Sequence, residues 1–352
     1  MNESVDVKDG IEPGQDWDVY LFRPEDALGV ARVFRAVYGD GYPVRTYIEP
    51  QLLIEENAAL RVISSVARTA RGEVVGHNAL YNSAAHPGTY ESGAGAVHAA
   101  YRGGKGIFTR MVDHGLEVAA TMPQVNAVFC EPVSNHLFSQ KLTDKAGFII
   151  RALEVELMPA AAYEKEASAS GRVSNFPTFR TLRARPHGVH LPRAYGDVMD
   201  FLYEGLDDER EFRVSTAALS PGTVSDIRSR VFESAGVARV AVHKPGGDFA
   251  SRMRQLEEEL RSRGVMVIQV WLNLACPDVG EAVDLLRNQG FFLGGVLPRW
   301  FDDDGMLMQK LFKPPAWDSI LTYGERADRV LELVRTDWEQ SVRAPGAWGS
   351  TS

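Results

Sequence analysis

The segment VHAAYRGGKGI, residues 97–107, joins a predicted strand to a predicted helix and decides how the chain is interpreted. Within it, Arg102 to Gly106 form a loop of five residues, three of which are glycine. Backbone N–H groups of such a loop can approach an anion, and the helix that follows adds the positive end of its dipole. Arg102 and Lys105 add positive charge. The loop therefore predicts a pyrophosphate site, with an ordinary strand-to-helix turn as the alternative.

The segments on either side of this loop predict a mixed α/β domain. Three strand-like runs separated by Gly and Pro form a predicted antiparallel meander. Apolar residues at helical spacing precede the meander twice and follow the loop once. The predicted strands are 17–22, 61–67, 74–81, 91–98, 127–130 and 149–157, and the predicted helices are 24–37, 51–57, 107–120 and 134–145.

The charge balance and the cysteine count exclude several classes of protein. The 352 residues include 38 Lys and Arg against 47 Asp and Glu, a net charge of -9, which disfavours nucleic-acid and anionic membrane partners. The two cysteines, Cys130 and Cys276, lack the spacing of a metal site, so no metal is expected. Neither a signal peptide nor a long apolar run occurs, so we expect a soluble, cytoplasmic protein.

Residues 97–107 resemble the V-x-P-x-[YF]-R-G-x-G-[IV]-G signature of the Gcn5-related N-acetyltransferase (GNAT) family. Asn135 with the later Gly147-Phe148 resembles the N-x-x-A…Y-x-K-x-G-F element of that family, and the resemblance covers residues 18–159. It implies acetyl-CoA or another acyl-CoA as cofactor. The residues expected to bind it are Ala96 and Val97 at the pantetheine arm, Arg102, Gly103, Gly104, Lys105, Gly106 and Ile107 at the pyrophosphate, and Asn135.

Four positions depart from the pattern of the family. The loop has one residue more than R-G-x-G, Phe108 stands in place of a small residue, and Ala99 replaces a proline. Thr143 occupies the position of the tyrosine that commonly protonates the leaving thiolate. A threonine is too weak an acid for that task, so water or another tyrosine, such as Tyr101, would have to replace it.

Acyl transfer to an amine requires a base that removes a proton from the ammonium group. Glu91 lies six residues before Val97, the offset of the catalytic glutamate in histone-type members, so the resemblance implies Glu91 as the base. A solvated carboxylate at a strand entrance and a proton relay through water are the alternatives. His136 is a second candidate base, with a structural histidine on a helix face as its alternative.

The acceptor site is expected in the segment between the first two helices. This segment contains Tyr38, Tyr42 and Arg45, and in the resembling fold it covers the acceptor. Glu131, just after a predicted strand, is expected near the same place. A packed aromatic loop is the alternative interpretation.

An internal duplication is indicated by two matched anchors. Ala96-Val97-His98 matches 241–243 and Gly147-Phe148 matches 290–291, with separations of 50 and 48 positions from Val97 and Val242. We therefore expect an α/β (α+β) fold with two GNAT-like domains, each a mixed, mostly antiparallel sheet flanked by helices. The expected boundaries are a tail at 1–16, domains at 17–160 and 176–340, a linker at 161–175 and a tail at 341–352.

The second copy has lost the signature. Its loop, Pro245 to Asp248, has no arginine in register and carries an acid where a phosphate would bind. The sequence therefore predicts an N-acyltransferase that moves an acyl group, foremost acetyl, to a small-molecule amine in the N-terminal domain. A non-catalytic acyl-CoA sensor is the main alternative. Aminoacyl transfer from charged tRNA is a weaker one, which the acidic charge disfavours.

Overall fold

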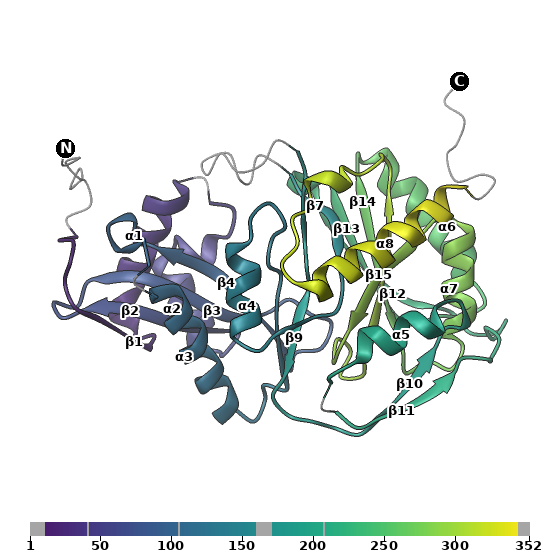
Figure 1. Cartoon of the computed structure of the whole chain (residues 1–352), viewed down its shortest axis with the longest axis horizontal. Coiled ribbons are helices and arrows are strands. Elements are labelled where there is room, and N and C mark those ends of the chain that lie inside the picture. Colours follow the sequence, from purple (N-terminus) through teal and green to yellow (C-terminus); the bar gives the residue numbers. More distant parts are fainter. Residues whose placement is uncertain (1–10, 41, 105, 160–170, 207, 344–352) are drawn as a thin grey trace. The chain divides into compact units, whose positions relative to one another are not determined.

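The computed structural model describes residues 11–40, 42–104, 106–159, 171–206 and 208–343, and these form two compact units, 1–129 and 130–352 (Figure 1). The division falls before the predicted linker, part of which lies outside the described residues. Residues of the predicted first domain, among them Leu153 and Val155, pack in the core of the second unit. The predicted domain limits, which follow the duplication in the sequence, stay a prediction.

Five strands of the first unit form a sheet in the order β1-β2-β3-β4-β5. Neighbouring strands are antiparallel except β4 and β5, which are parallel, so the predicted meander is confirmed. The strands are β1 (Trp17–Leu21), β2 (Val62–Thr69), β3 (Val74–Asn82), β4 (Thr89–Val97) and β5 (Ala127–Cys130).

Helices cover both faces of this sheet because apolar residues alternate on its strands. Val74 packs in a core with α1 (Ala27–Tyr38) and α2 (Pro50–Ala58), whereas the next residue, Val75, packs with α3 (Ile107–Thr121). Successive side chains of a strand point to opposite faces, so α3 lies on the face opposite α1 and α2.

The second unit contains a five-stranded sheet in the order β12-β13-β14-β16-β15, in which only β13 and β14 are parallel. Its strands are β12 (Asp226–Phe232), β13 (Val237–Lys244), β14 (Val267–Asn273), β15 (Phe292–Leu297) and β16 (Gly305–Leu311). Its longer helices are α5 (Gly196–Tyr203), α6 (Phe249–Ser262), α7 (Val279–Asn288) and α8 (Glu325–Arg343). Each unit is thus a mixed, mostly antiparallel sheet with helices, as the sequence predicts.

The remaining elements of the second unit are short. The predicted helix 134–145 is shorter in the structure, since α4 begins at Phe138, and the predicted strand 149–157 is interrupted at residues 151–153. There the backbone of Arg151 and Leu153 pairs with β15 instead. The elements are α4 (Phe138–Lys145), β6 (Ile149–Ile150), β7 (Glu154–Met158), β8 (Val173–Asn175), β9 (Thr178–Thr181), β10 (His187–Leu191) and β11 (Arg210–Val214).

The two units share one supersecondary order. In the first, β4 leads through a loop into α3 and then to β5, parallel to β4. In the second, β13 leads through a loop into α6 and then to β14, parallel to β13. Of the matched anchors of the sequence, Ala-Val-His lies at the end of β4 and in β13, and Gly-Phe lies directly before β6 and β15.

No helix in the described part of the chain has the length and apolar character needed to cross a membrane. Within the same residues, no group of three or more His, Cys, Asp or Glu is arranged to hold a metal ion.

Candidate functional site

The loop between β4 and α3 is open around its glycines. Gly103, Gly104 and Gly106 have φ angles of 87°, 90° and 73°, a left-handed conformation that glycine adopts without strain. Chain neighbours aside, a Cβ atom on any of the three would meet no described atom within 4 Å. Lys105 lies outside the described residues. The described part of the loop thus leaves space for another molecule next to its backbone.

The N–H groups of the three glycines in this loop are available for a ligand. Gly103, Gly104 and Gly106 donate no hydrogen bond to another described residue, and the first bond of α3 runs from Arg110 N to Gly106 O. The first-turn amides of a helix have no acceptor within the helix. Three left-handed glycines and a helix N-terminus therefore present unpaired donors, as an anion site requires.

Strand β4 separates from β5 before it reaches this loop. The two strands pair only from Thr89 to Glu91, opposite residues 127–129. Farther along, β4 carries one residue more than β3, because His77 pairs with Ala96 while Ala79 pairs with Gly93. Ala94, within this β-bulge, has a φ angle of 49°. The β5 side of residues 92–97 therefore has no strand partner in the described chain.

His77 holds the bulge from the core of the first unit. Its Nδ1 lies 2.9 Å from the carbonyl oxygen of Ala94, and its Nε2 lies 3.0 Å from Oγ of Ser64. Burial lowers the pKa of His77 to about 4, so the ring is neutral at pH 7. A carbonyl can only accept, so Nδ1 carries the proton and Nε2 accepts from Ser64.

Two aromatic side chains contact β4 at Gly95, beside the predicted pantetheine residues Ala96 and Val97. A Cβ atom on Gly95 would lie 2.1 Å from Cε2 of Phe108, so this ring rests directly on the strand. The hydroxyl of Tyr38 donates to the carbonyl of Gly95 at 2.6 Å. Phe108, the bulky residue at a small position of the motif, therefore covers part of the edge that a pantetheine arm would follow.

Arg102 points back toward β4. Its Nε donates to the carbonyl of Val97 at 2.9 Å, and the side chain is exposed. A ligand at the carbonyl of Val97 would have to displace this bond, and the released guanidinium would then be free to approach a phosphate.

Glu91 is held by two hydroxyl groups. Tyr81, its partner in the pairing of β3 with β4, donates to Oε1 at 2.6 Å, and Ser83 donates to Oε2 at 2.6 Å. Two short hydrogen bonds of this kind fix the orientation of the carboxylate. Tyr81 was not predicted as a site residue, although its place in a strand one hairpin before Glu91 could have indicated it.

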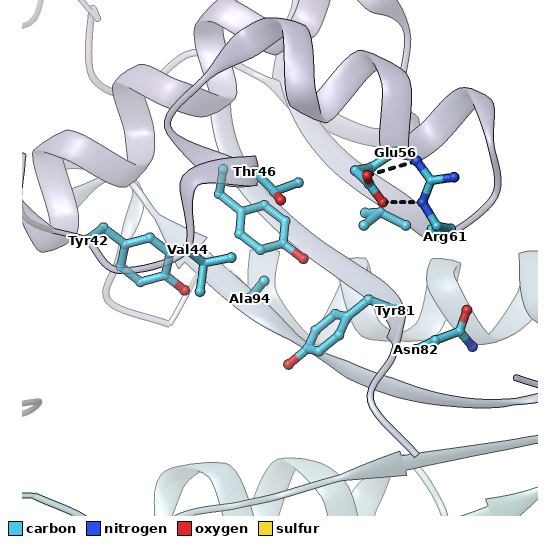
Figure 2. Close-up of a pocket in the computed structure, with 10 residues that line it drawn as sticks. Tyr42, Val44, Thr46, Glu56, Arg61, Tyr81, Asn82 and Ala94 are labelled. Atoms are coloured by element: carbon cyan, nitrogen blue, oxygen red, sulfur yellow. Dashed lines mark hydrogen bonds and ion pairs between the residues drawn. The ribbon is translucent and has the colours of Figure 1, made fainter. Parts of the chain in front are cut away.

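A cavity of about 310 Å³ lies beside the bulge of β4, and Figure 2 shows its lining. Of the predicted acceptor residues, Tyr42 lines this cavity, whereas Tyr38 stacks on Tyr42 with ring centroids 4.9 Å apart. Arg45 is exposed and pairs with Glu49 at 2.5 and 2.9 Å. The full lining is Tyr42, Val44, Thr46, Tyr47, Glu56, Arg61, Val62, Tyr81, Asn82 and Ala94.

Three predicted site residues, Glu131, Asn135 and His136, lie in the second unit. Glu131 accepts from Arg239 at 3.1 Å and from Asn175 at 3.2 Å. Asn135 and His136 precede α4 rather than lying on it. Because these three residues and the loop belong to different units, their participation in one site stays a prediction.

The ion pair of Glu131 belongs to a buried cluster. Arg239 also lies 3.6 Å from Glu154, whose pKa is raised to about 8 by burial and by the charge of Glu131. Glu131 therefore helps to balance Arg239 within the second unit.

No protein-family model matches the chain, and no curated protein matches it either. Solved structures match about half of it. An N-acetyltransferase from Staphylococcus aureus Mu50 is 18% identical, over 48% of this chain and 99% of that chain, with a TM-score of 0.39. A ribosomal-protein-S5-alanine acetyltransferase from Vibrio fischeri is 15% identical, over 47% and 92%, with a TM-score of 0.38. The yncA protein from Salmonella typhimurium, solved with its cofactor acetyl-CoA, is 14% identical, over 48% and 96%, with a TM-score of 0.39.

Each of the three structures matches 47–48% of this chain. Identities of 14–18% and TM-scores below 0.4 transfer neither a substrate nor a catalytic residue to this chain.

Proposed function

We propose that this protein is an N-acyltransferase that uses acyl-CoA, foremost acetyl-CoA, to acylate a small-molecule amine in its N-terminal domain. One observation carries the proposal. The loop of Gly103, Gly104 and Gly106 is open and its amides are unpaired, at the place where β4 has separated from β5. An extended cofactor with a pyrophosphate in its middle fits an anion site joined to a free strand edge.

The residues present fit both the pyrophosphate and the amide-containing arm of such a cofactor. The loop amides and the N-terminus of α3 would bind the pyrophosphate, with Arg102 as an additional cation. The edge of residues 95–97 has no strand partner on its β5 side, and an amide-containing arm would replace the bonds that Tyr38 and Arg102 donate to the carbonyls of Gly95 and Val97. Bound acyl-CoA supplies an activated thioester, and Glu91 with Tyr81 would take the proton of the attacking amine.

Titration calorimetry with acetyl-CoA and CoA tests the loop assignment. Gly106→Glu places a carboxylate where the pyrophosphate would bind, so affinity should fall on the order of 100-fold. Gly72→Glu is the matched control, because Gly72 has a φ angle of 83° and open surroundings in the turn between β2 and β3. Equal affinities for wild type and Gly106→Glu would refute the assignment.

A non-catalytic acyl-CoA-binding protein is the second candidate. The ring of Phe108 against Gly95 favours it, because the ring obstructs the edge that a productive cofactor would follow. The absence of a tyrosine at Thr143 favours it as well, since no side chain there can protonate a thiolate. Release of CoA thiol with a panel of amines supports the enzyme, whereas tight binding without thiol release supports the second candidate.

A further inference from the structure

We propose that the cavity beside β4 selects a small, positively charged amine, and that Tyr81 passes a proton of this amine to Glu91. The inference rests on the proposed function and deepens it, because it names the class of acceptor and the first group to receive the proton. It concerns only residues of the first unit.

The lining of the cavity suits an ammonium group. Tyr42, Tyr47 and Tyr81 line it together, and in Figure 2 the rings of Tyr42 and Tyr81 lie on either side of Ala94. Aromatic rings attract cations through their π faces, and their hydroxyl oxygens accept hydrogen bonds from N–H donors. A volume of about 310 Å³ lies at the lower end of the range for small-molecule sites, which limits the acceptor to a short molecule.

The charges around the cavity also favour a cation. Arg61 is the one basic side chain in its lining, and both ends of its guanidinium are bound by Glu56 at 2.7 and 2.9 Å. Glu91, which accepts a hydrogen bond from Tyr81, places a carboxylate one side chain away from the cavity. The pKa of Tyr47 is raised first by burial and then by Tyr42 and Glu91. The carboxylate of Glu91 is therefore close enough to act electrostatically on the hydroxyl of Tyr47.

Tyr81 separates Glu91 from the cavity. Tyr81 belongs to the lining, whereas Glu91 does not, and the hydroxyl of Tyr81 donates to Oε1 of Glu91 at 2.6 Å. A bound ammonium would therefore meet the oxygen of Tyr81 first. As this oxygen accepts a proton from the ammonium nitrogen, its own proton moves to Oε1 of Glu91. The amine is left neutral with a free electron pair, Tyr81 is unchanged, and Glu91 is neutral.

Binding without cofactor tests the cavity by itself. Titration of the full chain with 1,4-diaminobutane, n-butylamine, 4-aminobutyrate and n-butanol should show binding of the two cations and at least ten-fold weaker binding of the other two. Equal binding of all four, or preference for the carboxylate, would overturn the assignment. This measurement needs no acyl-CoA, so it gives a result even if the proposed function fails.

Turnover tests the relay. Tyr81→Phe should lower kcat on the order of 10²-fold, as the loss of general base catalysis does, while KM for acetyl-CoA stays within a factor of two. Glu91→Gln should lower kcat to the same extent, and the double variant should be no slower than either. Tyr20→Phe, which removes the hydroxyl of the exposed Tyr20 on β1, is the matched control. Wild-type kcat in Tyr81→Phe, with acetyl-CoA binding intact, would refute the relay without touching the acyl-CoA assignment.

Discussion

The loop after β4 and the loop after β13 occupy equivalent places in the two units, yet they use glycine in opposite ways. In the first loop a Cβ atom on Gly104 would meet no described atom within 4 Å beyond its chain neighbours. In the second, a Cβ atom on Gly246 would lie 2.3 Å from the carbonyl oxygen of Thr223, and one on Gly247 would lie 2.8 Å from that of Pro221. Glycine keeps space free in one unit and permits close packing in the other.

The two loops also differ in their hydrogen bonds, because the glycine amides of the second loop are bonded within the chain. Gly247 N donates to the carbonyls of Ser220 and Thr223, and Gly246 N donates to Oγ of Ser225. The acid at this loop, Asp248, accepts from both N and Oγ of Ser225 at 2.8 and 2.7 Å. The two glycine amides of the second loop are therefore already used within the chain and are not free to bind a phosphate.

The strands that flank the loops complete the contrast. β4 pairs with β5 at three positions and then separates, whereas β13 pairs with β14 at six consecutive positions, Val237 to Val242. A continuous ladder leaves no free edge beside the loop. The same order of elements thus forms a candidate site where pairing stops early and a closed core where it continues.

The largest effect on this comparison is expected from Gly247→Ala. Because the added Cβ would meet backbone atoms of Pro221, which cannot rotate away, the variant should lose about 3 kcal/mol of the free energy of unfolding. Gly104→Ala, at a φ angle of 90°, should lose only about 1 kcal/mol, from backbone strain alone. Urea denaturation measures both changes, provided that the dependence of the free energy of unfolding on urea concentration is the same in both variants. A larger loss in Gly104→Ala than in Gly247→Ala would reverse the contrast between the loops.

Sequence patterns predicted the helices and strands of both units well. The alternation of apolar residues in strands and their helical spacing are local properties of the sequence. They also placed the loop, since its three glycines are contiguous with an arginine. The difference between the loops was predicted only through Asp248 and the missing arginine. Nothing in the order of residues shows that Pro221 and Thr223, some twenty positions earlier, fill the space beside Gly246 and Gly247.

The candidate catalytic group was predicted in part for a similar reason. Glu91 follows from its offset to Val97, but its partners Tyr81 and Ser83 depend on the register of β3 against β4. His77 was missed because a buried histidine in an apolar strand has no signal of its own. Its role depends on the one extra residue in β4, which only the pairing reveals.

A smaller effect is expected from His77, which has no equivalent in the continuous ladder of the second unit. The ordinary pKa of histidine is 6.5 and that of His77 is about 4, so between these values the unfolded chain binds a proton that the folded chain does not. The stability of the wild type should therefore fall by about 2–3 kcal/mol as the pH drops through this window. His77→Leu should remove this fall, and release of the bulge at Ala94 should weaken acetyl-CoA binding about ten-fold.

Chemical denaturation at pH 4 to 7, together with calorimetry at pH 7, separates the two consequences of His77→Leu. His114→Leu is the control, because His114 lies on α3 and its Nδ1 contacts Oγ of Ser65 rather than the bulge. If His114→Leu weakened acetyl-CoA binding as much as His77→Leu did, the bulge would not be the structure that His77 supports.

The smallest effect is expected from Phe108→Ala. This variant would uncover the edge of β4 in the first unit and so increase its difference from the continuous β13–β14 ladder of the second. The ring of Phe108 rests on Gly95, so a pantetheine arm must displace it, and that displacement costs part of the binding energy. Removing the ring should tighten acetyl-CoA binding about three- to ten-fold, equivalent to roughly 1 kcal/mol. Phe138→Ala, which truncates an exposed phenylalanine on α4, controls for the loss of a ring. If affinity instead fell in Phe108→Ala alone, the ring would be a contact of the cofactor, and the edge at Gly95 would bind its ligand through Phe108 rather than beneath it.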